Sequence, residues 1–155
     1  MKQRLNPFKS VPELMQAMLA LSEKIEGAGL DRALAELVKT RASQINGCAY
    51  CIHMHTRDAR ANGETEERLL LLDAWRESPL YSERERAALA WAEALTSIAQ
   101  THAPDAVFAE ASRHFSEAEL AQLTLIVANI NAWNRIAMGL RFVHPTGAAR
   151  ARPAA

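Results

Sequence analysis

The chain of 155 residues has no excess charge of either sign, because eighteen Lys and Arg residues balance eighteen Asp and Glu residues. Proteins that bind nucleic acids neutralise phosphates with clustered basic side chains, and no window of this sequence is strongly basic. We therefore expect no nucleic-acid partner.

Long apolar runs are also lacking. The first ten residues, MKQRLNPFKS, contain no apolar stretch that could act as a signal peptide. The most apolar segment, 120–140, is interrupted by Asn129, Asn131, Asn134 and Arg135, which would be costly to place in lipid. We expect a buried helix here, no membrane partner, and a cytoplasmic location.

Signals for β-strands are nearly absent, whereas helix signals are frequent. Periodic apolar residues and helix-end residues predict helices at about 12–27, 31–46, 48–62, 64–75, 82–99, 104–115 and 116–142. Ser82 with Glu85, and Ser116 with Glu119, form predicted capping boxes. The length suits one domain. The predicted fold is all-α, a single-domain helical bundle of about six to seven helices over residues 1–155, with 144–155 as a loose tail.

The segment INGCAYCIHMHTRDA, residues 45–59, holds both cysteines and two of the five histidines. At about 100° per residue, a helix places Cys48, Cys51 and His55 on one narrow stripe beside apolar neighbours. His53 falls on the opposite, solvent-facing side. Two sulfurs and one imidazole are therefore expected to point inward together.

This arrangement suits redox chemistry of a dithiol. Cysteines three residues apart can close a disulfide, and the first turn of a helix stabilises a thiolate through unpaired N–H groups and the helix dipole. His55 can exchange a proton with a thiol near neutral pH. A thiolate that attacks a peroxide becomes a sulfenic acid, which a neighbouring thiol converts to a disulfide.

Two other roles for the cysteines remain open. A zinc site needs four ligands, and this helix supplies three, so the fourth would come from Asp58, Glu36, His102, His114 or His144. Alternatively, the cysteines fill a core. In a reducing compartment a permanent disulfide is the less expected use of a Cys pair, and the redox dithiol is the leading interpretation.

Helical periodicity by itself assigns solvated or packing roles to several other polar and aromatic residues. It places Glu36 away from the apolar stripe of its helix, together with Lys39 and Ser43, as a solvated residue. Arg41 lies on the apolar stripe and is expected to extend to solvent or to pair with a buried carboxylate at a subunit contact. Asn129, Asn131 and Asn134 are expected to bind backbone groups or neighbouring subunits. Trp133 is expected to pack, with pocket lining as the secondary role.

Three blocks of the sequence resemble a known family. They are ELVKTRASQINGCAYCIHMHTRDARANGETEERL from Glu36, then AWRESPLYSERERAALAWAEALT, then VANINAWNRIAMGLR. They are similar to the alkylhydroperoxidase AhpD-like branch of the carboxymuconolactone decarboxylase superfamily, and the resemblance covers roughly residues 10–143. It implies an all-helical domain that forms homo-oligomers (a dimer, trimer or hexamer) and acts as a thiol peroxidase without a cofactor or metal.

The resemblance also implies roles for individual residues. Cys51 would be the peroxidatic thiol, Cys48 its resolving partner, and His55 and Glu36 the proton relay. The implied partners are a hydroperoxide substrate and an external dithiol or a thioredoxin-like or lipoyl reductant. Founding members carry a second His directly before the second Cys, where this chain has Tyr50.

The sequence alone does not determine which cysteine attacks first or whether the dithiol is catalytic. The position at the helix end favours Cys48 as the exposed thiolate, whereas His55 and the family favour Cys51. The alternative function is a non-catalytic helical oligomer with structural zinc or a redox-sensing Cys pair.

Overall fold

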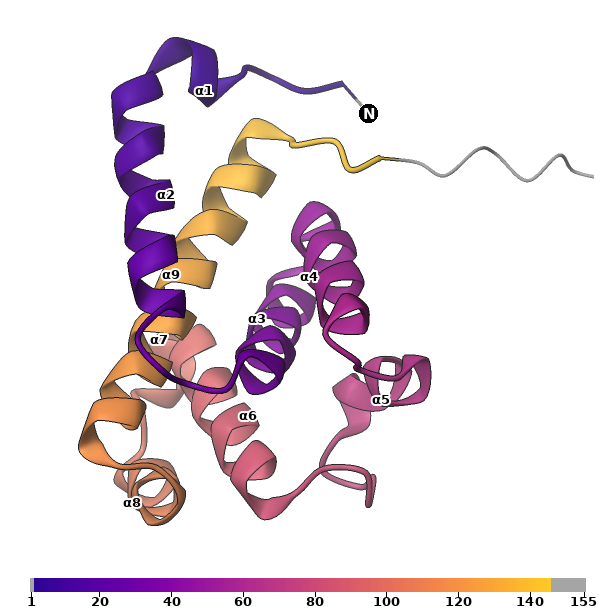
Figure 1. Cartoon of the computed structure of the whole chain (residues 1–155), viewed down its shortest axis with the longest axis vertical. Helices are drawn as coiled ribbons and strands as arrows, with labels where there is room; N and C mark the ends of the chain where they lie inside the picture. The colour runs from indigo at the N-terminus through magenta and orange to yellow at the C-terminus, as the bar shows by residue number, and fades with distance from the viewer. Residues whose placement is uncertain (1, 146–155) are drawn as a thin grey trace, which may run out of the picture.

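The computed structural model describes residues 2–145, so the predicted tail lies outside the described residues from position 146 onward. The described residues form helices in the order α1 (Pro7–Ser10), α2 (Pro12–Glu26), α3 (Arg32–Asn46), α4 (Ala49–Ala61), α5 (Glu66–Leu71), the 3₁₀ helix η1 (Leu72–Ala74), α6 (Glu83–Thr96), α7 (Ile98–Thr101), α8 (Asp105–His114) and α9 (Glu117–Leu140). Figure 1 shows their arrangement. The all-α prediction is confirmed.

The predicted number of helices is too low, because two short helices carry no periodic signal. Helix α1 has four residues and begins where the Asn6 side chain accepts a hydrogen bond from the N–H of Phe8 and Pro7 occupies the first turn. The helix predicted to run through residue 99 ends at Thr96, and α7 follows it after Ser97. The segment predicted as one helix at 64–75 divides into α5 and η1.

The end signals of the longer helices are confirmed. Ser82 and Ser116 each form a complete capping box, with Glu85 and Glu119 respectively. Gly47 closes α3 in the left-handed conformation, with φ of 71°. Because Gly adopts this conformation without a steric penalty, the chain can stop α3 and begin α4 within two residues.

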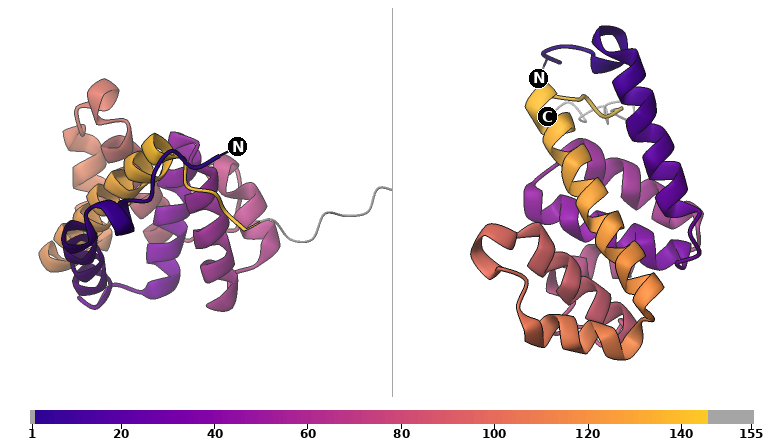
Figure 2. Two further views of the ribbon diagram at one scale, coloured as in Figure 1. Left: turned by 90° about the horizontal axis from the view of Figure 1, so that it is seen from above. Right: turned by 90° about the vertical axis from the view of Figure 1, so that its left-hand side faces the viewer.

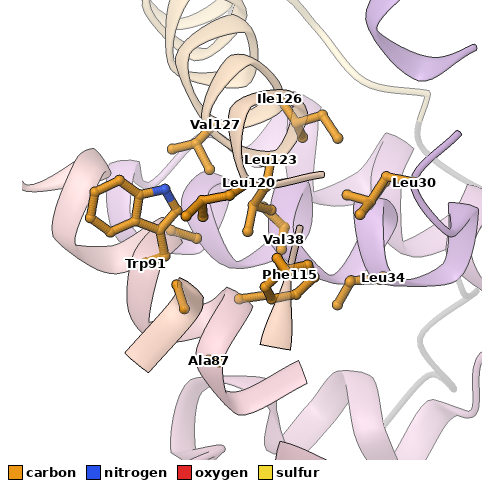
Figure 3. Packing of buried hydrophobic residues seen from close by; sticks show 14 of the residues in the cluster. Leu30, Leu34, Val38, Ala87, Trp91, Phe115, Leu120, Leu123, Ile126 and Val127 are labelled. Carbon is orange, nitrogen blue, oxygen red and sulfur yellow. The ribbon is translucent and has the colours of Figure 1, made fainter. Parts of the chain in front are cut away.

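The main core lies between α3, α6 and α9. Apolar side chains from these helices, together with Phe115, converge there, as Figure 3 shows. Val38 of α3 and Leu123 and Val127 of α9 have no exposed surface. Burial of each such side chain contributes about 1.5–3 kcal/mol relative to an exposed one. This core fixes α3 against α6 and α9.

Helix α3 is the central helix, with α4, α6 and α9 all packed against it (Figures 1 and 2). Every residue from Leu34 to Thr40 is buried. A helix covered on several sides has no solvent face, so its polar residues must find partners inside the protein.

The start of the chain and the end of α9 lie side by side (Figure 2). The backbone N–H of Arg4 donates to the carbonyl of Leu140 at 3.0 Å, and Arg4 Nη1 donates to the carbonyl of Gly139 at 2.8 Å. This pairing brings α1 to the end of α9. No helix within residues 2–145 is long and apolar enough to cross a membrane.

Candidate active site

The two cysteines lie at the start of α4 and are joined by a disulfide. Cys48 is the N-cap residue, and Cys51 lies in the first turn, where its N–H points at Cys48 Sγ at 3.4 Å. Cys48 is 1% exposed and Cys51 is 2% exposed. Ala137, Tyr50 and Phe142 pack around them. The pair is therefore a dithiol in its oxidised state, covered by apolar side chains.

His55 lies one turn after Cys51 on the same face of α4 and is buried. His53 lies on another face and is only half-buried. Its ring stacks on that of His144, with centroids 5.1 Å apart. Of the two histidines in the motif, only His55 is buried beside the cysteines.

The structure brings Glu36 next to His55. Glu36 is 4% exposed, and its Oε2 lies 2.9 Å from His55 Nδ1. Its other oxygen, Oε1, lies 2.6 Å from Nζ of Lys39, which is also buried. The solvated position predicted for Glu36, Lys39 and Ser43 from periodicity is wrong, because α3 is enclosed by its neighbours.

The surroundings of Glu36 keep its carboxylate ionised. Burial alone raises the pKa of this carboxyl, but the hydrogen bond from His55 and the positive charge of Lys39 outweigh burial and hold the pKa below its ordinary value. An ionised carboxylate can only accept hydrogen bonds, so His55 Nδ1 carries the hydrogen. Within the described residues, the buried Nε2 of His55 has no hydrogen-bond partner. This nitrogen remains available to a ligand.

A cavity of about 340 Å³ borders these groups. Cys51, His55 and Glu36 all line it, whereas Cys48 does not. The same cavity is lined by residues of α1, α2, α3, α4, α9 and the segment after α9, including Phe8, Leu19, Ser22, Lys39, Tyr50, Met54, Asn129, Ile130, Trp133, Ala137 and Phe142. A molecule in the cavity would therefore meet the sulfur of Cys51 rather than that of Cys48.

Aromatic side chains form one wall of the cavity. Tyr50 meets Phe142 edge to face with ring centroids 5.4 Å apart, and Phe142 lies 6.4 Å from Phe8. Trp133 lines the cavity, which was the secondary role expected for it after packing. Its Nε1 donates to Ser22 Oγ at 2.9 Å. Phe8 and Phe142 were not identified from the sequence, because only the pairing of the N-terminal segment with the end of α9 brings them to the site.

The polar residues of α9 bind partners within the same chain. Asn131 Nδ2 donates to Thr96 Oγ1 and to the carbonyl of Val127, and Asn134 Nδ2 donates to Ser43 Oγ at 3.1 Å. Asn46 Nδ2 donates to the side-chain oxygens of both asparagines. The bonds of Asn46 and Ser43 tie α3 to α9, and the bond to Thr96 ties α6 to α9.

The remaining polar positions also have partners on neighbouring helices. Asn129 Nδ2 donates to Ser22 Oγ at 2.9 Å. The Arg41 side chain is mostly buried and pairs within its own chain, with the partly buried Glu93 at 2.7 Å and with the exposed Asp73.

Within residues 2–145, no three or more His, Cys, Asp or Glu side chains are grouped so that they could hold a metal ion. Of the side chains considered as a fourth zinc ligand, Glu36 is bound to His55 and Lys39, and Asp58 lines the same cavity. His114 pairs with Glu110, Asp58 pairs with Arg57, and His102 ends α7 in a left-handed conformation. The geometry gives no support to a zinc site.

Comparison with known protein sequences identifies similar proteins across most of the chain. Residues 12–94 match the model of the carboxymuconolactone decarboxylase family. The uncharacterised protein YdfG of Bacillus subtilis (strain 168) is 41% identical over 140 residues, which cover 90% of this chain and 95% of YdfG. The uncharacterised protein YnjA of Escherichia coli (strain K12) is 31% identical over 113 residues, covering 72% of this chain and 62% of YnjA.

Solved structures share the fold. A protein of unknown function from Agrobacterium tumefaciens, described as a candidate antioxidant defence protein AhpD, aligns with a TM-score of 0.92 and 44% identity over 94% of this chain and 100% of its own. The debrominase Bmp8 aligns with a TM-score of 0.81 and 24% identity, over 90% of this chain and 75% of Bmp8. The second likeness concerns the fold alone.

Proposed function

We propose, from the premise that this chain belongs to the carboxymuconolactone decarboxylase family and to its AhpD-like branch, that it is a thiol-dependent peroxidase. It would reduce hydrogen peroxide or an organic hydroperoxide through a dithiol–disulfide cycle. The observation that carries the proposal is that Cys51, His55 and Glu36 line one cavity. Cys48, which does not line it, is joined to Cys51 by a disulfide.

The first step begins from the reduced dithiol. The Cys51 thiolate attacks the outer oxygen of the hydroperoxide, the O–O bond breaks, and the alkoxide leaves with a proton as an alcohol, or as water from hydrogen peroxide. Sulfur is oxidised to the sulfenic acid as the peroxide is reduced. Cys51 lines the cavity and Cys48 does not, which supports Cys51 as the attacking thiol.

In this proposal His55 and Glu36 handle the proton. In the neutral imidazole, Nδ1–H is held by the Glu36 carboxylate, so Nε2 is free to accept the proton of the Cys51 thiol and to return it to the departing oxygen. The carboxylate stabilises the imidazolium that forms in between. Both groups are buried, where such interactions are stronger than in water.

The second step closes the disulfide. The Cys48 thiol attacks the sulfenic sulfur of Cys51, which releases water and forms the bond that the structure contains. An external dithiol then reduces this bond: it attacks Cys51 from the cavity, Cys48 leaves as a thiolate, and the second external thiol displaces Cys51 from the mixed disulfide. Departure of Cys48 is favoured because the first turn of α4 stabilises a thiolate.

The test measures hydroperoxide consumption with a dithiol donor for the wild type and single variants. Cys51→Ser should abolish turnover. Without the donor, Cys48→Ser should consume about one equivalent of hydroperoxide and leave a sulfenic acid that a dimedone-type probe traps. His55→Ala should slow the reaction by about 10²-fold, with His53→Ala as the matched control. Unchanged turnover in Cys51→Ser would overturn the proposal.

The alternative function is separated by a second measurement on the same protein. A zinc-bearing or redox-sensing helical oligomer would show stoichiometric zinc after purification without chelator, or a disulfide that forms without catalytic turnover. Metal analysis and a count of free thiols identify the zinc-bearing form, and the absence of turnover in the hydroperoxide assay identifies the redox sensor.

A further inference from the structure

Lys39 is a buried cation that the proposed reaction leaves without a role. It lies on α3 one turn after Glu36, and its side chain is 8% exposed. Its Nζ lies 2.6 Å from Glu36 Oε1 and 2.8 Å from Glu26 Oε1 on α2. A buried lysine is rare unless it is paired, and here it is paired on both sides.

The two oxygens of Glu36 are held by different groups. Oε2 accepts from His55 on α4, and Oε1 accepts from Lys39 on α3 itself. Two short contacts to opposite ends of one carboxylate fix both its position and its rotation. Since the plane of the carboxylate aims Oε2 at Nδ1, the contact with Lys39 also orients the imidazole.

Other charged groups around Glu36 do not take the place of Lys39. Those lining the shared cavity are Glu23 and Glu26 from α2, Arg32 from α3, and Asp58 from α4, besides His55 and Lys39. The residues that α9 contributes to this cavity are uncharged. Arg32 is exposed, and the ion pairs that Glu36 forms within the described residues are those with Lys39 and His55. Without Lys39, the buried Glu36 would keep His55 as its single ion-pair partner among the described residues.

A second cavity of about 280 Å³ adjoins this ion cluster. Glu26, Glu36 and Lys39 line both cavities, whereas Cys51 and His55 line only the first. The ion cluster therefore borders both cavities, and Lys39 belongs to the lining of the site.

We propose that Lys39 is a positioning residue of the site, which keeps Glu36 ionised and directed at His55 and so sets the acid limb of the reaction's pH profile. This inference rests on the proposed function for its catalytic readout. An adjacent ammonium favours the ionised carboxylate, so removal of the ammonium lets Glu36 take up a proton at a higher pH. The proton relay is then lost at a higher pH.

The experiment compares Lys39→Met, Lys39→Arg and the control Lys24→Met, which removes an exposed lysine of α2. In Lys39→Met, kcat should fall about 10-fold at neutral pH with a smaller change in KM, and the acid limb should move up by about one pH unit. Lys39→Arg, which keeps the charge, should restore the limb. The inference would be overturned if the acid limb of the pH profile stayed at the wild-type pH in Lys39→Met, or if it moved equally in Lys24→Met.

A second readout does not depend on turnover. In the Cys48→Ser background, the rate at which iodoacetamide alkylates Cys51 is followed against pH, and Lys39→Met should move its lower limb upward. If the wild type reduces no hydroperoxide while this limb still moves, the proposed function fails and the inference about Lys39 stands. If Lys39→Met does not fold, Lys39→Gln replaces it, with the same expected result.

Discussion

Glu36 Oε2 lies 2.9 Å from His55 Nδ1, with both side chains buried and nineteen residues apart in the chain. The contact fixes which nitrogen of the imidazole carries the hydrogen, because an ionised carboxylate only accepts. The opposite nitrogen is thereby kept as a proton acceptor beside the cavity that Cys51 lines.

Replacement of Glu36 by Gln tests this relationship. The amide can hold the imidazole but cannot stabilise an imidazolium by charge, so we expect kcat/KM for hydroperoxide to fall about 10²-fold. The measurement is the initial rate with a dithiol donor, and Glu67→Gln, on the exposed surface of α5, is the control. A loss below about twofold in Glu36→Gln would contradict the role given to this carboxylate.

Replacement of Phe142 by Ala tests access to the disulfide. Both sulfurs are nearly inaccessible, and Phe142 packs on Tyr50 beside them. Its removal should speed reduction by a bulky dithiol about 10-fold, with a smaller effect on a small reductant such as dithiothreitol, because rates of thiol–disulfide exchange depend on access. Stopped-flow measurement of both rates checks this. Val143→Ala, at the neighbouring exposed residue, should change neither.

Replacement of Tyr50 by Phe tests whether the hydroxyl replaces the histidine of founding family members. Tyr50 contacts Phe142 edge to face and lines the cavity. If its contribution is packing, Tyr50→Phe should keep peroxidase activity within about twofold at every pH, since the ring contact is retained. A large loss of rate, confined to one limb of the pH profile, would instead assign proton transfer to the hydroxyl.

Protonation of Glu93 at low pH should lower the stability of the folded protein. Burial raises the pKa of this carboxyl, but hydrogen bonds from Trp75, Arg41 and Arg76 outweigh burial and hold the pKa below 4.5. A lowered folded-state pKa contributes stability that is present above the unfolded pKa and is lost as pH falls through the folded value, hence below about pH 4.5.

Glu93→Gln should therefore lower the free energy of unfolding by about 2 kcal/mol at pH 7, because the mostly buried Arg41 loses one of its two carboxylate partners. The difference from wild type should shrink at pH values below 4.5. Urea unfolding at both pH values, with the disulfide kept intact, measures it. Glu77→Gln, at an exposed position, should follow the wild type throughout.

Two leucines of α9 differ in their burial. Leu123 has no exposed surface, whereas Leu125 is 53% exposed. Leu123→Ala should destabilise the protein by about 2–5 kcal/mol through lost burial and a cavity, and Leu125→Ala by less than about 0.5 kcal/mol. The urea midpoints of both variants provide the comparison. Equal losses would mean that Leu125 is covered in the state of the protein that is measured.

Local sequence determined most of the helices and the internal arrangement of α4. Helix ends depend on residues within one turn, as with Ser82 and Glu85 or with Gly47, so they can be recognised without knowledge of the tertiary structure. The common face of Cys51 and His55 follows from helical periodicity alone. Short helices such as α1 escaped prediction because four residues show no period.

Only the tertiary structure decided the environment of the site. Periodicity compares residues within one helix and cannot show that a polar face is covered by another helix. For this reason it predicted solvated positions for Glu36 and Lys39, which are buried. Likewise, Phe8 reaches Phe142 only because the N-terminal segment pairs with the end of α9. The thiol and imidazole are placed by local geometry, and the carboxylate, its lysine and the aromatic wall by the packing of distant segments.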